Sequence, residues 1–597
     1  MAQPIHTFED FERISRAVVS AELSLVRPEG AAASRKRDLR PVWRRFRVPL
    51  LATLPTVPLY VVWWLFLATG GGDLAAQEAW ADFASRHGGS AYSLFWYGGM
   101  HTANYSLISP YLMAAFGVRT VTVAAGLLAA WLASVLIVRT GIRRPLGPAL
   151  LASLALWCNV ASGRTTFALG VALGLAACVL LTRERRMPLA VAYAALAAMA
   201  SPVAGLFLVV AGAGHALVRD RVRAATLIVP PVVVVGTTTL LFPFTGEQLM
   251  PAARIWPPVV IGLVVLTLAP RGWRVLRWGA VVYAAGTVLT YLVPSPVGTN
   301  VERLAELFAP AALLAALLAV PSHRQTAEPQ GRAGVEGASA RRPEGSSTVV
   351  PSTPAEAPRR RSQKRRRVAL AMALVFSVGW VGKKTVDDLQ VSTVVPAWAH
   401  DTTSVVEALD RLGADRTRVE VVPARNHREA TALAPHVNLA RGWNRQLDME
   451  RGRLFYDGTF SETTYRAWLD RWAVGFVVLP SGKPDGFAED EARLVARGTE
   501  WLEPVWRDVN WRVYRVRGAV PLVSRPATVV RADSAAVLVH VPRAGSVTVR
   551  VAFSPWLYAE GGCLEKAGEF TRLTVTEPGE YRISSGYGPS PGPAPRC

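Results

Sequence analysis

The chain has 597 residues, of which 51% are hydrophobic and 18% charged, with a formal net charge of +22 and a mean hydropathy of +0.24. Apolar runs of about 15–22 residues recur through its first two thirds, which predicts a polytopic membrane protein and excludes a cytosolic enzyme, a secreted disulfide scaffold and a disordered chain. Because the basic residues lie mainly between apolar runs, as the positive-inside rule predicts, we expect the lipid bilayer as a partner and no nucleic acid.

Residues 1–34 are polar, and the basic run Arg35–Arg47 precedes the first apolar segment without a signal-peptide cleavage site. We therefore expect a cytoplasmic N-terminal segment at 1–47 that leads into an uncleaved membrane anchor. About eleven transmembrane helices are predicted, in a transmembrane domain at 48–320 and a last helix at 368–383. Their approximate ranges are 48–69, 119–138, 146–162, 165–182, 188–200, 203–217, 224–242, 256–269, 275–293, 304–320 and 368–382.

The stretch 188–217 has two interpretations, one long helix kinked at Pro202 or two short helices. Arginines lie before it, from Arg183, and after it, from Arg219, and positive residues prefer one side of a membrane. Both ends should therefore be cytoplasmic, which requires two helices that meet at Ser201 near the outer face. With eleven spans the N-terminus is cytoplasmic and the C-terminal region extracytoplasmic, in a multi-pass protein of the plasma membrane.

Residues 321–367 contain eleven Arg or Lys and four Asp or Glu, a net charge of 11 − 4 = +7, among many Pro, Ser, Gly and Ala. This composition predicts a disordered basic cytoplasmic linker, whose basic end at 359–367 is interpreted as an anchor to anionic lipid. Mixed helical and strand patterns then predict an extracytoplasmic α/β domain at 384–517. Short alternating strands predict an extracytoplasmic β-rich domain, a β-sandwich, at 518–597.

Four cysteines are too few for a disulfide framework. Cys158 and Cys178 lie in apolar segments and are interpreted as small core residues. Cys563 and Cys597 lie in the region that we place outside the membrane, where a bridge is chemically permitted. The sequence leaves open whether they are bridged.

The long first outer loop, 70–118, opens with Gly70-Gly71-Gly72-Asp73, where the first span leaves the membrane. Aromatic and polar residues alternate along it, which predicts one or two amphipathic helices on the outer leaflet with Trp and Tyr at headgroup depth. Asp73 is the candidate catalytic base, because a carboxylate beside lipid in a Gly-rich turn is partly desolvated. The alternative is that Asp73 is a helix N-cap.

Other polar residues of this loop are candidate substrate contacts. Glu78 and Asp82 lie four residues apart and share a helix face, which is also typical of a solvated surface. His87 and His101 are interpreted as interfacial polar groups rather than metal ligands, and His101 and Tyr105 join the candidate substrate contacts. No HExxH or CxxC pattern marks a metal site, so no cofactor is expected, although a divalent metal stays open.

Two tight outer loops end in arginines, Arg164 and Arg303. An arginine at the outer face of a membrane can bind a lipid phosphate through two parallel hydrogen bonds. The alternative is a snorkelling or internally paired side chain, and Glu302 is a ready partner for Arg303. Asn300, in the second of these loops, is a further candidate substrate contact.

The order of these features resembles the GT-C superfamily of membrane glycosyltransferases, especially the actinobacterial arabinofuranosyl- and mannosyltransferases of the cell envelope. The shared outline is a first span, a long outer loop that opens with an Asp, short paired helices and a C-terminal outer domain. The tandem acid pair of some arabinosyltransferases is absent, because Gly72 precedes Asp73. Segments that look like these proteins are Gly98-Gly99-Met100-His101 through Ser109-Pro110-Tyr111, Ala440-Arg441-Gly442-Trp443-Asn444-Arg445-Gln446-Leu447-Asp448, Leu454-Phe455-Tyr456 and Tyr465-Arg466-Ala467-Trp468-Leu469.

The resemblance implies inverting transfer of a sugar from a polyprenyl-phosphate donor to a cell-envelope glycan acceptor on the outer face. Arg164 or Arg303 would hold the donor phosphate, while Asp73 would take the proton of the attacking acceptor hydroxyl. Trp556 would hold acceptor glycan, unless the β-rich region is a packing lid. Two other functions stay open, a non-catalytic membrane scaffold of envelope biogenesis and a transporter. The lack of internal repeats and of charge within the spans argues against transport.

Overall fold

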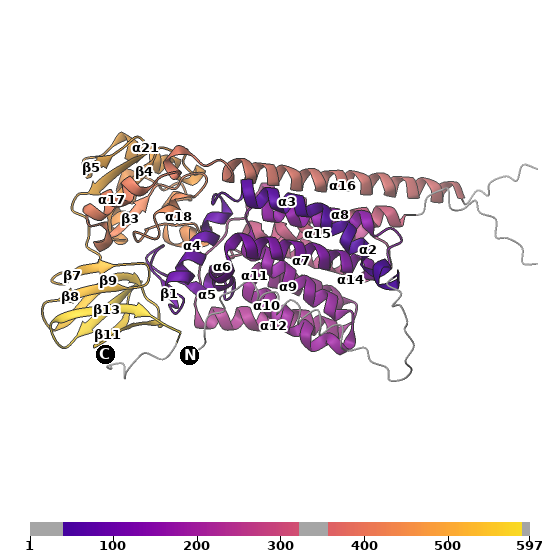
Figure 1. Cartoon of the computed structure of the whole chain (residues 1–597), viewed down its shortest axis with the longest axis horizontal. Coiled ribbons are helices and arrows are strands. Elements are labelled where there is room, and N and C mark those ends of the chain that lie inside the picture. The colour runs from indigo at the N-terminus through magenta and orange to yellow at the C-terminus, as the bar shows by residue number, and fades with distance from the viewer. Residues whose placement is uncertain (1–39, 321–355, 588–597) are drawn as a thin grey trace, which may run out of the picture. The chain divides into compact units, whose positions relative to one another are not determined.

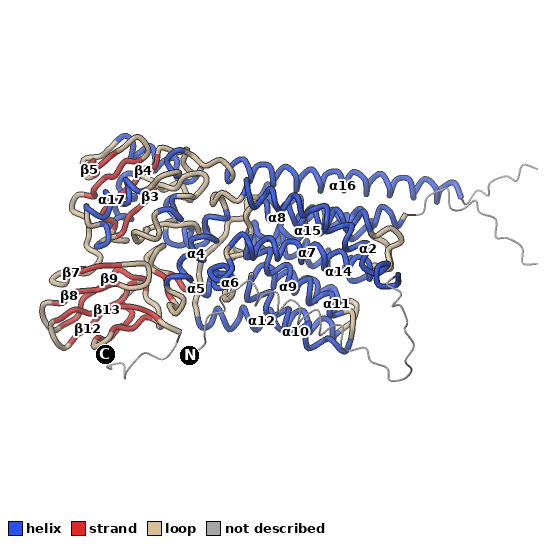
Figure 2. Tube along the Cα trace, in the orientation of Figure 1, coloured by secondary structure: helices blue, strands red, loops and turns tan. Residues whose placement is uncertain are grey.

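The computed structural model describes residues 40–320 and 356–587 of the chain. Helices dominate the described part up to Ser392, and strands follow, apart from the short hairpin of β1 (Tyr92–Ser93) and β2 (Met100–His101) (Figure 2). The helices at the predicted spans are a segmented first helix (α2 Arg40–Thr53, η1 Leu54–Thr56, α3 Val57–Val62, η2 Trp63–Leu67), α7 Val118–Arg139, α8 Leu146–Ala161, α9 Thr165–Leu181, α10 Met187–Ala200, α11 Pro202–Leu217, α12 Arg221–Leu241, α13 Ala252–Leu268, α14 Arg274–Leu292, α15 Glu302–Ala319 and α16 Glu356–Ser392.

Among the described residues, five helices are long and apolar enough to cross a membrane by length and composition. Each of the eleven predicted spans is helical in the structure, so that part of the prediction is confirmed. That all eleven helices cross a membrane stays a prediction. The five are Phe46–Leu67, Val118–Arg139, Arg221–Leu241, Arg274–Leu292 and Arg361–Ser392, and the shorter apolar helices are Leu146–Ala161, Thr165–Leu181, Pro202–Leu217 and Ala252–Leu268.

The stretch 188–217 forms two helices, α10 and α11, and not one kinked helix. The chain breaks at Ser201, whose backbone is extended, and Pro202 starts the next helix, where its missing N–H costs no hydrogen bond. The free carbonyl of Ala200 accepts hydrogen bonds from the hydroxyls of Ser106 (2.9 Å) and Ser109 (3.0 Å). The break is therefore stabilised by the loop 70–118.

Helix α16 corrects two predicted boundaries (Figure 1). It runs for 37 residues, so it includes 356–367, which the sequence analysis placed in the disordered linker, and 384–392, which it placed in the α/β domain. Charges lower hydropathy, but Arg and Lys are good helix formers, so the helix includes the basic stretch before the apolar segment. After the apolar segment, Lys383 and Asp387 form an ion pair four residues apart, which supports a helix. The rest of the predicted linker, 321–355, and the N-terminal residues 1–39 lie outside the described residues.

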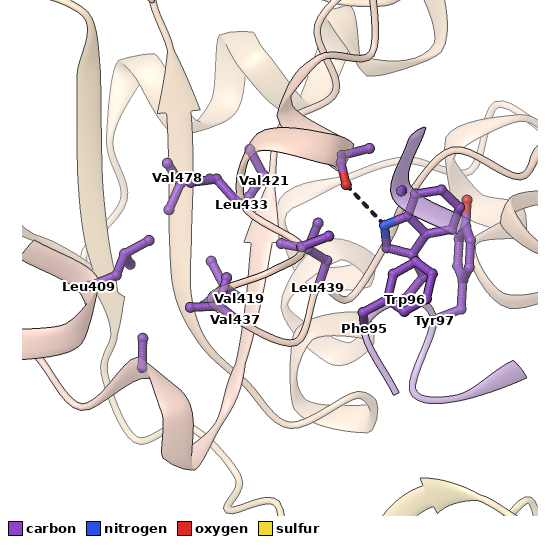
Figure 3. Packing of buried hydrophobic residues seen from close by; sticks show 14 of the residues in the cluster. Phe95, Trp96, Tyr97, Leu409, Val419, Val421, Leu433, Val437, Leu439 and Val478 are labelled. Carbon is purple, nitrogen blue, oxygen red and sulfur yellow. Dashed lines mark hydrogen bonds between the residues drawn. The ribbon is translucent and has the colours of Figure 1, made fainter. Parts of the chain in front are cut away.

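The loop 70–118 contains three helices, α4 (Asp73–Arg86), α5 (Thr102–Tyr105) and α6 (Ser109–Phe116). Trp80 and Trp96 are fully buried in protein, so these two rings do not face lipid, while the predicted headgroup depth of the loop stays a prediction. Figure 3 shows Trp96 at one end of a cluster of buried side chains, on the side of Leu439, and its Nε1 donates a hydrogen bond to the carbonyl of Ala430 (3.2 Å). Alternating aromatic and polar residues are typical of any apolar–polar boundary, so the pattern did not distinguish protein from lipid.

The predicted α/β domain is built on a four-stranded mixed sheet with the order β3-β4-β6-β5. β3 and β4 are parallel, β4–β6 and β5–β6 are antiparallel, and β4 is buried along nearly its whole length. The elements are η6 Ala397–Ala399, α17 Thr403–Arg411, η7 Ala414–Arg416, β3 Arg418–Val421, α18 Glu429–Ala432, α19 Arg445–Arg451, η8 Arg453–Phe455, α20 Glu462–Arg471, β4 Val474–Pro480, η9 Gly486–Ala488, α21 Glu489–Arg497, β5 Leu502–Arg507 and β6 Trp511–Val516.

The C-terminal part is rich in β-strands, as predicted, but its strands form one seven-stranded antiparallel sheet and not the two sheets of a sandwich. Side chains of β8 and β9, which lie far apart in the sheet order, share one apolar core, so the sheet curls around its own buried face. Cys563 is disulfide-bonded, while Cys597 lies outside the described residues. The strands are β7 Thr528–Ala532, β8 Val537–Val541, β9 Gly545–Ala552, β10 Leu557–Ala559, β11 Gly562–Ala567, β12 Phe570–Val575 and β13 Gly579–Ser585.

Candidate functional site

Asp73 lies at the start of α4, and the structure brings it together with both arginines singled out from the sequence. Its Oδ2 is 3.6 Å from Nη2 of Arg303 and 3.9 Å from Nε of Arg164. Gly72 is the residue at the N-cap position, with no side-chain capping bond, so the N-cap alternative for Asp73 is not observed. The Asp73 side chain is 36% exposed, so its carboxylate is accessible to a substrate.

Arg164 is held by several carboxylates. Its Nη1 is 2.6 Å from Oε2 of Glu306, and its Nη2 is 3.3 Å from Oδ2 of Asp388. Only 10% of the side chain is exposed. Arg164 therefore joins α15 and α16 to the loop between α8 and α9, which corresponds to the internally paired alternative. A guanidinium engaged in this way is poorly suited to bind a lipid phosphate as well.

Glu302 does not pair with Arg303, which corrects an expectation from the sequence. Its carboxylate is 99% buried and contacts Nζ of Lys384 (2.5 Å) and Nη1 of Arg254 (3.3 Å). Lys384 also donates to Glu306. Consecutive residues of a helix point in different directions, so Glu302 and Arg303 diverge from the start of α15. Glu302 therefore belongs to the structural ion network and leaves Arg303 facing Asp73.

Arg303 is the more available of the two arginines. Its guanidinium carbon lies 5.3 Å from the ring centroid of Phe167, and 20% of its side chain is exposed. Among the described residues its ion-pair partner is Asp73, at 3.6 Å, which is longer than a hydrogen bond. An incoming anion could therefore bind Arg303 without breaking a tight internal pair.

Tyr105 places a polar hydroxyl in the interior beside this cluster. Its ring stacks on Trp80 with centroids 5.3 Å apart, and its buried hydroxyl has no hydrogen-bond partner among the described residues. Burial raises the pKa of Tyr105, and the negative charge of Asp73 raises it further, so the phenol stays protonated. Arg303, Thr166 and Gln77 lower the pKa in part, and the role of Tyr105 as a substrate contact stays a prediction.

Glu78 and Asp82 do not form a pair on α4. Burial raises the pKa of Glu78, although Arg119 and Arg428 oppose the shift. Asp82 is partly exposed, and its Oδ2 accepts a hydrogen bond from Nε of Arg86 (3.1 Å). Asp82 therefore matches the solvated-face interpretation, whereas Glu78 points toward protein.

His101 lies in the protein interior, which does not favour its predicted role as a substrate contact. It is 6% exposed, and its Nε2 is 2.9 Å from Oγ of Ser554 in the C-terminal β-rich part. Its ring lies between those of Tyr92 and Phe242, at centroid distances of 4.9 and 5.4 Å. Burial lowers the pKa of His101 to about 4, with a smaller contribution from Arg451, so the ring is neutral at pH 7.

We expect His101 to make the protein sensitive to acid. An unfolded histidine titrates near pH 6.5 and folded His101 at about 4, so between these values only the unfolded chain binds the proton. Stability is therefore lost as the pH falls from about 6.5 to 4, by about 3 kcal/mol. Thermal unfolding between pH 4 and 7.5 should show this slope for wild type and for His540→Gln, an exposed control. An equal slope in His101→Gln would contradict the assignment.

Within the described residues, neither Asn300 nor Trp556 contacts the cluster around Asp73. Asn300 lies half-buried in η4 (Gly298–Val301), just before α15. Trp556 stacks on Phe242 at 4.9 Å and donates its Nε1 hydrogen bond to the carbonyl of Leu241 (2.8 Å). Because protein covers a ring face and takes the N–H, Trp556 corresponds to the packing-lid alternative and not to an open platform for glycan.

Four residues of the cluster were missed by the sequence analysis, Arg254, Glu306, Lys384 and Asp388. Lys384 and Asp388 lie in the last three turns of α16, which was expected to end near residue 383. Their spacing of four residues, on a helix that continues past its apolar segment, is the signal that could have indicated a charged helix face. Within residues 40–320 and 356–587, no group of three or more His, Cys, Asp or Glu is arranged to hold a metal ion.

Comparison with known proteins adds one match. Residues 524–596 match a family described as a domain of unknown function, DUF8823. No curated protein matches the chain. All seven strands of the curled β-sheet lie within the matched residues, and none of the residues of the cluster around Asp73 does.

Proposed function

We propose that this protein is a membrane glycosyltransferase that transfers a sugar from a polyprenyl-phosphate donor to a cell-envelope glycan, with inversion at the anomeric carbon. One observation carries the proposal: an accessible carboxylate, Asp73, lies 3.6 Å from a loosely paired arginine, Arg303, where several apolar helices end. A base and an anion-binding cation side by side are what transfer from a lipid phosphate requires.

In this mechanism the two side chains exchange partners when the donor binds. The donor phosphate takes the place of Asp73 on Arg303, which frees the carboxylate. Asp73 then accepts the proton of the acceptor hydroxyl as that oxygen attacks the anomeric carbon and the bond to the phosphate breaks. Arg303 stabilises the departing phosphate, and the Tyr105 hydroxyl donates a hydrogen bond to the substrate.

We propose the plasma membrane as the location, with eleven spans, the N-terminus inside and the α/β and β-rich domains outside. Two observations support this arrangement. The disulfide at Cys563 suits an oxidising compartment, which is the outer side of a plasma membrane. Basic residues gather at alternate helix ends, at 139–144, 183–186, 219–223, 271–277 and 361–367, and positive residues favour the cytoplasmic side.

A non-catalytic scaffold of envelope biogenesis is the second candidate, and the ion network favours it. The carboxylates beside Asp73 are matched by nearby cations, so the cluster is close to neutral without a ligand. Such a network could serve only to hold helices together. Its acids are Asp73, Glu302, Glu306 and Asp388, and its cations are Arg164, Arg254, Arg303 and Lys384.

A transfer assay distinguishes the two candidates. The protein in nanodiscs is offered a panel of radiolabelled polyprenyl-phosphate sugars with a crude envelope glycan acceptor, and donor binding is measured in parallel. A transferase incorporates label into the glycan with at least one donor. Failure of both transfer and donor binding across the panel would contradict the proposal and favour the scaffold.

Arg303→Gln should weaken donor binding by about 10- to 100-fold, because it removes hydrogen bonds between a cation and the phosphate, worth about 1.5–3 kcal/mol. Arg303→Lys should retain part of the affinity, since it keeps the charge but not the bidentate geometry. Arg86→Gln, which removes a surface arginine paired with Asp82, is the control and should bind as wild type. Donor affinity equal in Arg303→Gln and Arg86→Gln would exclude Arg303 as the phosphate ligand.

A further inference from the structure

The glycine turn that precedes Asp73 is bound by the α/β domain. The backbone N–H of Gly72 donates to the carbonyl of Asn426 (2.8 Å), and the carbonyl of Gly72 accepts from Nε1 of Trp443 (2.9 Å). Gly72 has a φ of +65°, a conformation that side chains disfavour. The α/β domain therefore binds both polar groups of the residue next to Asp73, and the Gly72 carbonyl also accepts from the backbone N–H of Ala75 (3.1 Å).

Arg428 attaches the same turn to the end of α16. Its guanidinium donates to the carbonyl and the hydroxyl of Thr69 and to the carbonyl of Ser392 (2.7 Å). A Cβ on Gly71 would lie 2.6 Å from that Ser392 oxygen, so the contact leaves no room for a side chain. The turn is thus packed tightly against its surroundings.

Two further features make the contact rigid. The hydroxyl of Thr431 donates to the carbonyl of Ala75 (2.8 Å), in the first turn of α4. Trp443 is itself held in place, because its ring stacks on His427 at 3.5 Å with an angle of 14° between the planes, and the guanidinium of Arg445 lies 5.1 Å from its centroid. The indole N–H therefore points at Gly72 from a fixed ring.

We infer that these four residues of the α/β domain form a turn clamp, defined as Asn426, Arg428, Thr431 and Trp443, which sets the position of the Asp73 carboxylate. Trp443 is then a positioning residue for the base, although it acts through the backbone of Gly72. The inference rests on the proposed function, since it assigns the α/β domain a role in that reaction. A reacting group displaced by about 1 Å loses about 100-fold in rate, so a loosened clamp should lower turnover.

The test uses two conservative variants of the full-length chain in nanodiscs. Trp443→Phe keeps an aromatic ring beside His427 and removes the N–H donor, while Thr431→Val keeps the shape of the side chain and removes the hydroxyl. Trp501→Phe is the matched control, because Nε1 of Trp501 donates to Glu462 (3.0 Å) elsewhere in the same domain. Hydrogen exchange of the 70–76 amides and steady-state transfer kinetics are measured for each protein.

Loss of one hydrogen bond of the clamp should make exchange in the turn about 3- to 10-fold faster. The kcat should fall by about 10-fold in Trp443→Phe, with the donor KM unchanged, because phosphate binding by Arg303 is not affected. Unchanged exchange in both variants would overturn the inference, whatever the activity. A variant with faster exchange but the same kcat as Trp501→Phe would also overturn the inference. The clamp would then hold the turn, but its loosening would not affect the base.

The exchange measurement needs no activity, so failure of the proposed function is recognised separately. A wild type that transfers no sugar would overturn the catalytic role of the clamp together with the proposed function. Exchange would then decide only whether the clamp holds the turn.

Discussion

Asp73→Asn should reduce sugar transfer by 100-fold or more, within the range of about 10²–10⁴ that a general base contributes. The amide has nearly the shape of the carboxylate but cannot accept the proton of the acceptor hydroxyl. Donor binding should persist or improve slightly, because the variant removes the anion that competes with phosphate for Arg303. A fall in kcat without a rise in the donor dissociation constant is therefore the expected signature.

Asp82→Asn is the matched control for this variant. Asp82 is an acid on the same helix, α4, but it is paired with Arg86 at the surface. Its transfer rate should stay within about twofold of wild type, as expected for a surface substitution. If Asp73→Asn transfers sugar at the rate of this control, Asp73 is not the base. Glu78, on the next turn of α4, would then be tested as the base.

The helices of this chain could be predicted because their ends carry local signals. The break between α10 and α11 follows from a proline and from the arginines at either side of 188–217. The length of α16 could not be predicted in the same way. Hydropathy falls at the charged residues Lys384 and Asp388, whose partners lie far away in the sequence, Glu302 in α15 and Arg164 in the loop between α8 and α9.

The candidate site could be predicted residue by residue but not as an assembly. Asp73, Arg164 and Arg303 were each singled out from their position at the end of an apolar segment. Arg164 forms an ion pair with Glu306, whereas Arg303 is only loosely paired with Asp73. This difference depends on contacts between segments far apart in the sequence, so no local pattern indicates it. The turn clamp could not be predicted from the sequence either, because Trp443 and Gly72 lie far apart along the chain.

The aromatic residues of the loop 70–118 show a different limit. Trp80 and Trp96 suit a membrane interface as well as a protein core, because both surroundings offer apolar contact to a large aromatic ring. The structure places them in the core shared with the α/β domain. This core brings the loop and the domain together, and it is the reason why the domain can reach Gly72.

A buried ion cluster in the α/β domain is where we expect a single substitution to cost the most stability, because it would leave buried charge uncompensated. Nε of Arg441 donates to Oε1 of Glu420 (2.8 Å), and its Nη2 donates to Glu491. The hydroxyl of Tyr465 donates to the same Glu491 (2.8 Å), and the guanidinium lies 3.7 Å from the ring centroid of Phe455. Arg441 is therefore the cation that compensates two fully buried carboxylates.

Arg441→Ala should destabilise the protein by about 3–5 kcal/mol, the usual cost of leaving buried charge uncompensated. Burial already raises the pKa of Glu420, and loss of Arg441 should raise it further. The folded variant then binds more protons than the unfolded chain above about pH 4.3, so the loss of stability should grow as the pH rises from 5 to 8. Apparent unfolding temperatures at both pH values, in nanodiscs, measure this.

Two variants separate this explanation from simple loss of packing. Arg493→Ala removes an exposed arginine paired with Asp490 in the same domain and should cost little. Adding Glu420→Gln to Arg441→Ala should recover part of the loss, because one uncompensated charge is then removed; a further loss would contradict the electrostatic explanation.

Since Arg441 lies two residues before Trp443, melting of this cluster should also release the turn clamp. Hydrogen exchange at 70–76 should then rise in Arg441→Ala but not in Arg493→Ala.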